Sequence, residues 1–272
     1  MLKNFSGEWN KMKVSLIDLA FLSEKRKDVL LLLEEGPKTG DEIKTALNVN
    51  STSIMPQIKK LKEGHLIVQD DRNNYKLSDI GEVVVEKMEP LLNTVRVFEE
   101  NYDYWTNHDF TAIPEYLLNR IDELGNYFML EADLNRLFEI PEDFKNNLLV
   151  SKNVKMFLSY FNPLHIEMYL ELAKKGAELC LILTEPVFDR MKMDYFKELK
   201  SLMESKNVQI YICDKNITLK NVVTERFCLL VLFDKKGKFD HQRLMSYDES
   251  AFKWCEELFM HYKNMSTRLE KL

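Results

Sequence analysis

The chain has 272 residues, of which 45% are hydrophobic and 30% are charged, a composition typical of a soluble globular protein with room for two domains. No apolar run reaches the roughly 18 residues of a membrane-spanning helix. The N-terminal segment also lacks the apolar core and small-residue cleavage site of a secretory signal. We therefore expect a cytoplasmic protein.

The net charge of −6 disfavours a protein that coats nucleic acid, but the charge is unevenly distributed. Residues 1–80 contain 13 Lys/Arg and 12 Asp/Glu, whereas residues 81–272 contain 25 and 32. Any DNA binding would therefore come from a local patch on a near-neutral N-terminal domain, joined to a more acidic remainder.

Cysteine and histidine spacing predicts no metal site and no cofactor. No C-x-x-C pair is present, and the histidines show no ligand spacing with cysteine or carboxylate residues. The cysteines lie in three strand-like runs and one helical segment, which predicts buried, reduced thiols; a redox sensor is the alternative. These cysteines are Cys180, Cys213, Cys228 and Cys255.

The first 82 residues have the pattern of a winged helix-turn-helix domain. The apolar run 16–22 predicts a helix packed on this domain, and a second helix spans Ser23 to Gly36. Thr39 then caps a helix with Glu42 at the capping-box position. The next helix places Ile54, Ile58 and Leu61 on one face, and strand-like HLIVQ and YKLSD bracket the turn DDRNN.

Residues 83–124 are predicted to form a helical linker and a dimerisation region. The pattern from residue 80 to residue 107 is helical, with a kink expected at Pro90, and residues 108–124 continue as a helical connection. A helix packed only on its own domain is the alternative. The apolar stripe that motivates the dimer consists of Val84, Met88, Leu91, Val95 and Phe98.

Residues 125–272 have the pattern of an α/β domain. The runs NYFMLEA, VKMFLSYF, AELCLILTE and VQIYICDK are strand-like, and helices at residues 165–175 and 187–205 separate the last three. This alternation predicts a parallel sheet covered on both faces. RFCLLVLF and FDHQRLMSY then predict a hairpin around DKKGK, and residues 249–269 predict a closing helix.

With these motifs the whole chain resembles archaeal transcriptional regulators of the methanogenesis-regulatory family. The resemblance rests on LNVNSTSIMPQIKKLKEGHLI, YFNPLHIEMYLELAKKGAELCLIL and FDKKGKFDHQRLMSYDESAFKWCEELFMHY. The third is the most specific, because its G-x-x-D turn and W-x-x-E-L-F helix are not generic. The C-terminal half also resembles the phospholipase-D-like effector domain of archaeal sugar-sensing regulators. The resemblance implies a mixed α+β and α/β chain with an N-terminal winged helix-turn-helix.

Phospholipase D enzymes carry H-x-K-x-x-x-x-D twice, and this chain does not retain that motif. His241, Arg243 and Asp248 match its spacing, but the resemblance places the motif on the strand before the hairpin turn. There Asp234 is retained, while Phe227 and Leu229 stand at the histidine and lysine positions, and neither can attack or hold a phosphate. With no P-loop, nucleophile elbow or G-x-G-x-x-G, we expect no enzyme and no catalytic residues. A phosphodiesterase using His241 stays as an alternative.

The carboxyl ends of the predicted parallel strands are where a small-molecule effector would bind. Helix capping and turn formation are the alternative roles for each residue there. The candidate ligand-binding residues are Ser159, Tyr160, Asn162, Thr184, Glu185, Asp214 and Lys215.

The exposed face of the helix that carries Ile54, Ile58 and Leu61 predicts contact with double-stranded DNA. Lysines there could reach phosphates or guanine, while Met55 and Pro56 offer apolar surface to thymine methyl groups. Since proline is disfavoured inside a helix, we expect this helix to begin with Ser53 as its N-cap. The candidate DNA-binding residues are Thr39, Ser51, Thr52, Met55, Pro56, Lys59, Lys60, Arg72, Asn73 and Asn74.

These observations predict a homodimeric transcriptional regulator that responds to a small-molecule effector, with no membrane association. A winged helix used for protein contact is an alternative, favoured by the near-neutral charge of residues 1–80.

Overall fold

The computed structural model describes residues 15–131 and 139–272 and divides the chain into two compact units. The boundary between the units falls between Leu92 and Asn93. Residues 1–14 of the predicted first domain and Ala132 of the predicted strand NYFMLEA lie outside the described residues. Each unit has its own core and is described separately.

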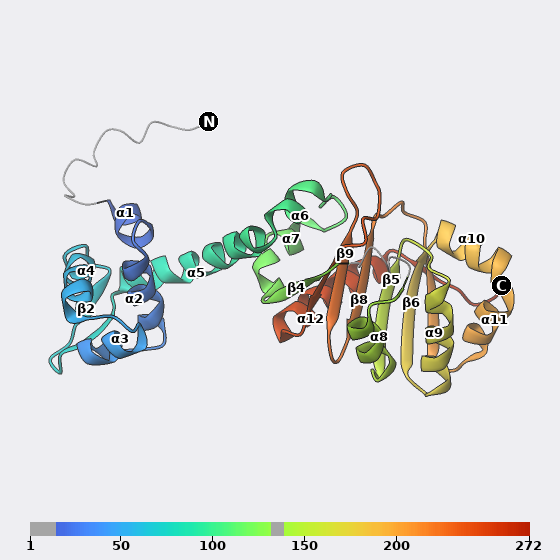
Figure 1. The fold of residues 1–272 in the computed structure, drawn as a ribbon, viewed down its shortest axis with the longest axis horizontal. Coiled ribbons are helices and arrows are strands. Elements are labelled where there is room, and N and C mark those ends of the chain that lie inside the picture. The colour runs from blue at the N-terminus through green and yellow to red at the C-terminus, as the bar shows by residue number, and fades with distance from the viewer. Residues whose placement is uncertain (1–14, 132–138) are drawn as a thin grey trace. The chain divides into compact units, whose positions relative to one another are not determined.

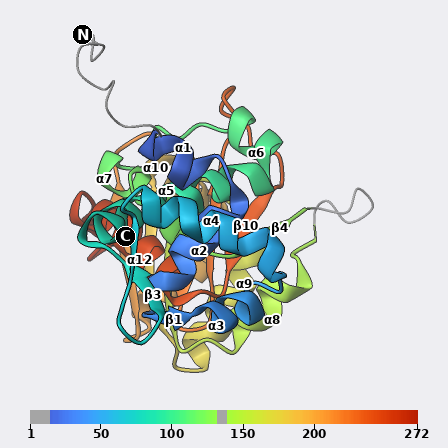
Figure 2. The same ribbon diagram turned by 90° about the vertical axis from the view of Figure 1, so that its left-hand side faces the viewer.

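The helices of the first unit follow one another in the predicted order (Figure 2). The capping box at Thr39 is present, because its hydroxyl accepts from the backbone N–H of Glu42 and the Glu42 carboxylate accepts from the backbone N–H of Thr39. Leu19 and Ala20 join the core, so the run 16–22 packs as predicted. The helices are α1 (Leu16–Phe21), α2 (Glu24–Glu34), α3 (Gly40–Ala46) and α4 (Ser51–Glu63).

The start predicted for α4 was wrong. The N-cap is Asn50, whose side-chain Oδ1 accepts from the backbone N–H of Ser53, so Ser53 lies inside the first turn. Pro56 is consequently the sixth helical residue, where its ring removes one helical hydrogen bond and crowds the Thr52 carbonyl, at a cost of about 3 kcal/mol. Burial of Ile54, Ile58 and Leu61 offsets that cost.

A three-stranded antiparallel sheet in the order β1-β3-β2 completes the first unit, with β1 (Lys38–Thr39), β2 (Ile67–Gln69) and β3 (Asn74–Leu77). The β2–β3 hairpin confirms the predicted pairing of HLIVQ with YKLSD. At its turn, the Asp70 carboxylate accepts from the backbone N–H groups of Arg72 and Asn74, while Asn73 adopts a φ of 62°. Asparagine tolerates this left-handed conformation better than most residues.

Helix α5 (Asp79–Glu100) spans the boundary between the units as one continuous element, with Pro90 inside it. Its residues contribute to two different cores: Met88 is buried among residues of the first unit, and Val97 among residues of the second. Leu91 and Val95, between them in sequence, are 52% and 42% exposed.

The second unit is built on an eight-stranded mixed sheet in the order β11-β7-β6-β5-β8-β9-β10-β4 (Figure 1). The predicted parallel pairing is confirmed for β5-β6-β7, and the predicted hairpin is confirmed for β9 and β10. The strands are β4 (Tyr127–Leu130), β5 (Asn153–Leu158), β6 (Glu178–Thr184), β7 (Val208–Cys213), β8 (Leu219–Thr224), β9 (Cys228–Leu232), β10 (Arg243–Ser246) and β11 (Thr267–Arg268).

Strand β8 was not predicted. It pairs antiparallel with both β5 and β9, which makes the centre of the sheet mixed rather than parallel. The first predicted strand, β4, pairs antiparallel with β10 at one edge instead of joining the parallel strands.

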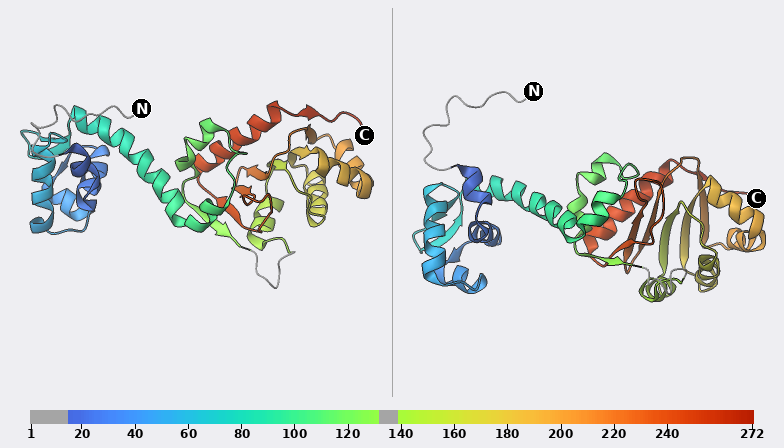
Figure 3. Two further views of the ribbon diagram at one scale, coloured as in Figure 1. Left: turned by 90° about the horizontal axis from the view of Figure 1, so that it is seen from above. Right: turned by 45° about the horizontal axis from the view of Figure 1, so that its top comes forward.

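Helices cover both faces of this sheet, as predicted, with α12 (Glu249–Asn264) on one face and α9 to α11 on the other (Figure 3). The single helix predicted for residues 187–205 is divided at Tyr195 into α10 and α11. The bounds on the second face are α8 (Glu142–Leu149), α9 (Leu164–Lys174), α10 (Glu185–Asp194) and α11 (Phe196–Glu204).

Residues 93–124 pack into the core that α12 forms with the sheet. Trp105 donates its indole N–H to the hydroxyl of Tyr127, and Trp254 of α12 donates to the carbonyl of Leu117. The helical elements here are short: α6 (Tyr102–Asn107), α7 (Glu115–Leu118) and the 3₁₀ turn η1 (Ile121–Leu124).

Candidate functional site

The exposed face of α4 presents a mixture of polar and apolar side chains beside the β2–β3 hairpin. The buried stripe of Ile54, Ile58 and Leu61 fixes the opposite face toward solvent. Thr52 donates its hydroxyl hydrogen to the side chain of Asn50, 2.8 Å away. The exposed candidates on this helix are Ser51, Thr52, Met55, Pro56, Lys59 and Lys60.

The lysines of α4 differ in their neighbours. Lys59 lies 3.8 Å from the Glu63 carboxylate one turn later, and both side chains are largely exposed. Lys62 donates to the side-chain carbonyl of Gln69 on β2. Lys60 is exposed and makes no ion pair with the described residues.

The remaining candidate DNA-binding residues lie in the hairpin turn and at the start of α3. Arg72 and Asn73 are exposed, and Asn74 is half-buried with its amide donating to Asp70. The hydroxyl of Thr39 is engaged in the capping box, since it donates to the Glu42 carboxylate at 2.9 Å. Backbone and hydroxyl donors at Thr39 hold the pKa of Glu42 below its usual value.

The structure does not bring all the candidate ligand-binding residues together. Tyr160 and Asn162 line one cavity. Ser159 donates its hydroxyl hydrogen to the carbonyl of Leu219, and Thr184 is buried with a hydroxyl that has no partner among the described residues. The exposed residues Glu185, Asp214 and Lys215 line none of the cavities described below.

The cavity at Tyr160 and Asn162 has a volume of about 440 Å³ and opens between the start of α9 and the segment before β10. Its wall is aromatic: Tyr160 stacks on Phe239 with ring centroids 4.7 Å apart, and Phe239 lies 4.6 Å from the His241 ring. A narrow floor beneath it is formed by a second group of residues that includes Phe144, His165, Lys220, Leu229 and Arg243.

Lys220 is a buried cation in the centre of the sheet, only 2% exposed. Its Nζ atom lies 3.4 Å from Nδ1 of His165 and about equally far from the rings of Phe144 and Tyr160, at 5.2 and 5.4 Å. Burial, and secondarily the charge of Arg243, lowers the pKa of Lys220 to about 7. Burial, with the charges of Lys220 and Arg243, also holds the pKa of His165 well below its usual value.

Arg243 is the second buried cation, 9% exposed at the start of β10. One guanidinium nitrogen donates to the carbonyl of His241 at 2.8 Å, and the group lies over the Phe239 ring. His241 has a φ of 67°, a conformation that disfavours any residue with a Cβ atom. This strained turn directs the His241 carbonyl toward Arg243.

The positions of the phospholipase D pattern have structural roles. Phe227 and Leu229 are fully buried, and the carboxylate of Asp234 accepts from backbone N–H groups of its own turn. His241 lies in the segment before β10, not on that strand as predicted. The carboxylate of Asp248 accepts from the backbone and side chain of Asn126.

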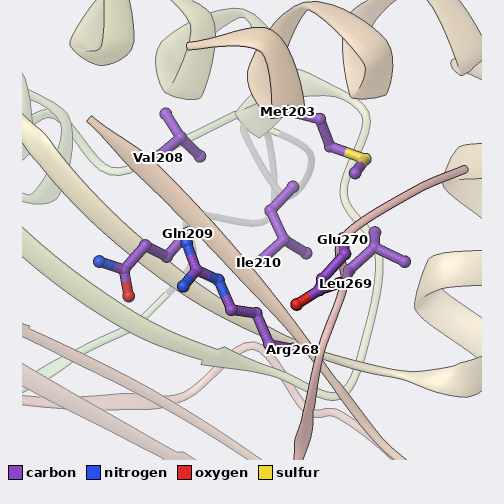
Figure 4. Close-up of a pocket in the computed structure, with 7 residues that line it drawn as sticks. All are labelled: Met203, Val208, Gln209, Ile210, Arg268, Leu269 and Glu270. Atoms are coloured by element: carbon purple, nitrogen blue, oxygen red, sulfur yellow. The ribbon is translucent and has the colours of Figure 1, made fainter. Parts of the chain in front are cut away.

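A further cavity of about 350 Å³ lies at the opposite edge of the sheet, where β7 meets β11 (Figure 4). Its lining carries Arg268 and Glu270, which bear opposite charges. Within residues 15–131 and 139–272, no cluster of three metal-ligating side chains occurs, and no helix is long and apolar enough to cross a bilayer.

Comparison with known proteins places both units in one group of proteins. Residues 137–265 match the family described as the methanogenesis regulatory protein FilR1, middle domain, and residues 15–100 match the HVO_A0261 N-terminal domain. The chain is 25% identical over 254 residues to the methanogenesis regulatory protein FilR1 of Methanothrix harundinacea, covering 92% of this chain and 57% of that protein. These matches confirm the resemblance of the chain to archaeal transcriptional regulators of the methanogenesis-regulatory family.

A second relative is the HTH-type transcriptional activator ArnR of Sulfolobus acidocaldarius, 28% identical over 129 residues, which are 47% of this chain and 45% of ArnR. The chain thus spans about half the length of the curated relatives that it matches. Among solved structures, TrmBL2, an archaeal chromatin protein, aligns with 93% of this chain and 97% of its own at a TM-score of 0.44 and 12% identity. NucT from Helicobacter pylori aligns with 53% of this chain and 98% of its own chain, at a TM-score of 0.40 and 12% sequence identity.

Proposed function

We propose that this protein is a DNA-binding transcriptional regulator that reads duplex DNA with α4 and contacts the flanking backbone with the turn between β2 and β3. The observation that carries the proposal is the exposed face of α4, held outward by a fully buried stripe beside an exposed hairpin turn. The names of both curated relatives support it, since one is a regulatory protein and the other an HTH-type transcriptional activator.

The side chains on the exposed face of α4 predict a modest electrostatic contribution to DNA binding and an additional apolar contribution. Lys60 supplies an unpaired charge for phosphate, whereas Lys59 would first have to leave Glu63. Met55 and Pro56 add apolar surface that suits thymine methyl groups in the major groove. Sequencing the genomic fragments that the protein retains would identify its operator, and retention of no fragment above background would contradict the proposal.

We propose further that the regulator is a homodimer joined through α5. Apolar side chains on this helix are left in solvent within the single chain: Ile80 is 52% exposed and Val83 61%, and Leu91 and Val95 extend the same stripe. Met88 does not contribute, because the first unit buries it. A second copy of the chain that covered this stripe would remove it from water.

The second unit is proposed to sense a small molecule and to have a phospholipase-D-like fold without phosphodiesterase activity. The buried Phe227 and Leu229 support the loss of the catalytic histidine and lysine. We retain residues 1–82, 83–124 and 125–272 as the proposed functional division. In it, residues 83–124 join the DNA-binding part to the sensing part.

A protein-contact role for the winged helix is the competing proposal, and the pairing of Lys59 with Glu63 on its exposed face favours it. Salt dependence separates the two, because phosphate contacts make log K for duplex DNA fall steeply with log salt. A flat salt dependence would favour protein contact.

A further inference from the structure

Two buried basic side chains lie on the same face of the sheet, and neither pairs with a carboxylate among residues 15–131 and 139–272. Lys220 comes from β8 and Arg243 from β10, the strands on either side of β9. Among the residues that the structure describes, no Asp or Glu oxygen lies within 4.0 Å of either side chain. Buried charges in proteins are normally paired, because removing an ion from water costs several kcal/mol.

The neighbours of these cations compensate them only weakly. His165 and the rings of Phe144 and Tyr160 surround the Lys220 ammonium group, at distances longer than a strong hydrogen bond allows. For Arg243, the described partners are the carbonyl of His241, the Phe239 ring and the Tyr160 hydroxyl. A guanidinium has five N–H donors, so most of its capacity is left for a ligand.

The cavity above the cations has the size and lining of a small-molecule site. Its volume of about 440 Å³ falls within the usual range for such sites, roughly 300–1,000 Å³. Arg243, Asn162 and Glu139 line both the cavity and its floor, whereas Lys220 lines only the floor, a space of about 10 Å³. Asn162 uses its side-chain oxygen to accept from the Leu164 N–H, which leaves its amide nitrogen as a donor. Glu139 is the carboxylate among the described lining residues, and it is exposed to solvent.

Lys220 lies close to the position that the lysine of the phospholipase D motif H-x-K-x-x-x-x-D would occupy. Leu229, which stands at the lysine position of that pattern, lines the floor beside Lys220. The positive charge is therefore supplied from the neighbouring strands β8 and β10, while the nucleophile position, Phe227, is apolar. Such a site could hold an anion without attacking it.

We propose that this cavity binds a small organic anion, whose phosphate or carboxylate group pairs with Arg243 and Lys220 and whose apolar body lies against Tyr160 and Phe239. The inference rests on the proposed sensing role of the second unit and gives its effector a chemical class. Arg243 supplies the directional, forked hydrogen bonds, and Lys220 supplies a charge behind it. Asn162 adds a neutral donor at the mouth.

Calorimetric titration of the full chain with phenyl phosphate, benzoate and inorganic phosphate tests this inference. We expect one of the two aromatic anions to bind at least about tenfold more tightly than inorganic phosphate, because only they can use the aromatic wall. Tighter binding of phenyl phosphate assigns the site to phosphates, and tighter binding of benzoate assigns it to carboxylates.

Substitutions then locate the site. Lys220→Met keeps the shape of the buried side chain and should weaken binding about tenfold or more, the factor expected for losing one charged contact. Arg243→Gln should do the same, while Lys197→Met, which removes an exposed cation of α11 outside the cavity, should bind like wild type. Equal binding by Lys220→Met and wild type, or no binding of either aromatic anion to wild type, would overturn the inference.

Retention on genomic DNA, measured on the same preparations, separates this inference from the proposed function. Anion binding without DNA retention would leave the cavity assigned and reject the regulator. DNA retention without anion binding would do the reverse.

Discussion

The two units differ in the solvent exposure of their lysine side chains. On α4 the lysines are solvated, and Lys59 has 76% of its side chain exposed. In the second unit Lys220 is 2% exposed among aromatic rings and a histidine. An exposed lysine costs the fold little and attracts any phosphate, whereas a buried lysine destabilises the fold until a fitting anion arrives. The first arrangement suits a long polyanion and the second a small ligand of defined shape.

The largest expected effect comes from removing the buried charge. We expect Lys220→Met to raise the free energy of unfolding at pH 7 by about 3–5 kcal/mol, because a lysine pKa lowered from 10.5 to about 7 corresponds to about 1.4 kcal/mol per unit. Chemical denaturation followed by circular dichroism measures it. A less stable variant would show that the ammonium group is well compensated and would remove the contrast between the units.

The same substitution has a pH signature. Between pH 7 and 10.5 the unfolded chain holds the Lys220 proton and the folded chain does not, so the wild type should gain stability as pH rises through this window. Groups facing Lys220 are Arg243, His165 and Tyr160, and all remain in Lys220→Met. The stability difference between the two proteins should therefore shrink toward pH 10. A constant difference would argue against titration of Lys220.

A substitution in helix α5 tests whether its exposed apolar side chains form the proposed dimer interface. We expect Leu91→Asp to weaken a symmetric dimer by about 3–4 kcal/mol, because each subunit loses one buried leucine and gains a charge at the contact. Light scattering over a concentration series would measure this. Glu99→Ala, on the same helix but outside the stripe, is the control, and an unchanged dimer in Leu91→Asp would move the contact elsewhere.

Pro56 offers a smaller test within the first unit. Pro56→Ala restores a helical hydrogen bond in α4 and should stabilise the protein by about 1–3 kcal/mol toward urea. Met55→Ala, also exposed on α4, should change stability by less than about 0.5 kcal/mol. Loss of stability in Pro56→Ala would mean that the ring makes contacts that outweigh its helical cost.

The smallest effect belongs to a single exposed lysine. Lys60→Ala should lower the slope of log K against log salt by about 0.9 per subunit, and Lys59→Ala by less, because Glu63 already neutralises part of its charge. Lys62→Ala, whose amine donates to Gln69, serves as the control. If Lys59→Ala and Lys60→Ala both bind operator and scrambled duplex like wild type at every salt concentration, α4 does not contact DNA.

Local signals account for what the sequence predicted well. The capping box at Thr39 and the apolar stripe of Ile54, Ile58 and Leu61 are set within a few residues, and both occur as expected. The error at the start of α4 arose because Pro56 was weighed as a helix breaker, while the burial of the stripe outweighed its cost. In α4, the packing of the buried stripe therefore outweighs the low helix propensity of proline.

The cavity floor escaped prediction because its charges lie in a buried strand. The segment LKNVVT contains the polar residues Lys220 and Asn221, whose side chains are unusual in a fully buried strand, although Val222 to Thr224 are β-branched residues that favour a strand. Arg243 was weighed only as part of a catalytic motif. The signal that could have predicted the site was the leucine at the lysine position of that motif. A site that lacks this lysine can still bind an anion if a neighbouring strand supplies a cation.

Helix α5 also limits how these units can be recombined. One helix contributes Met88 to the core of the first unit and Val97 to the core of the second, so each end of this segment must present the right face to its own core. Each residue inserted there would turn the following segment by about 100° and advance it by about 1.5 Å. A chimera that grafts another sensor onto this winged helix would therefore have to supply, at the position of Val97, a side chain that the core of the new sensor can bury.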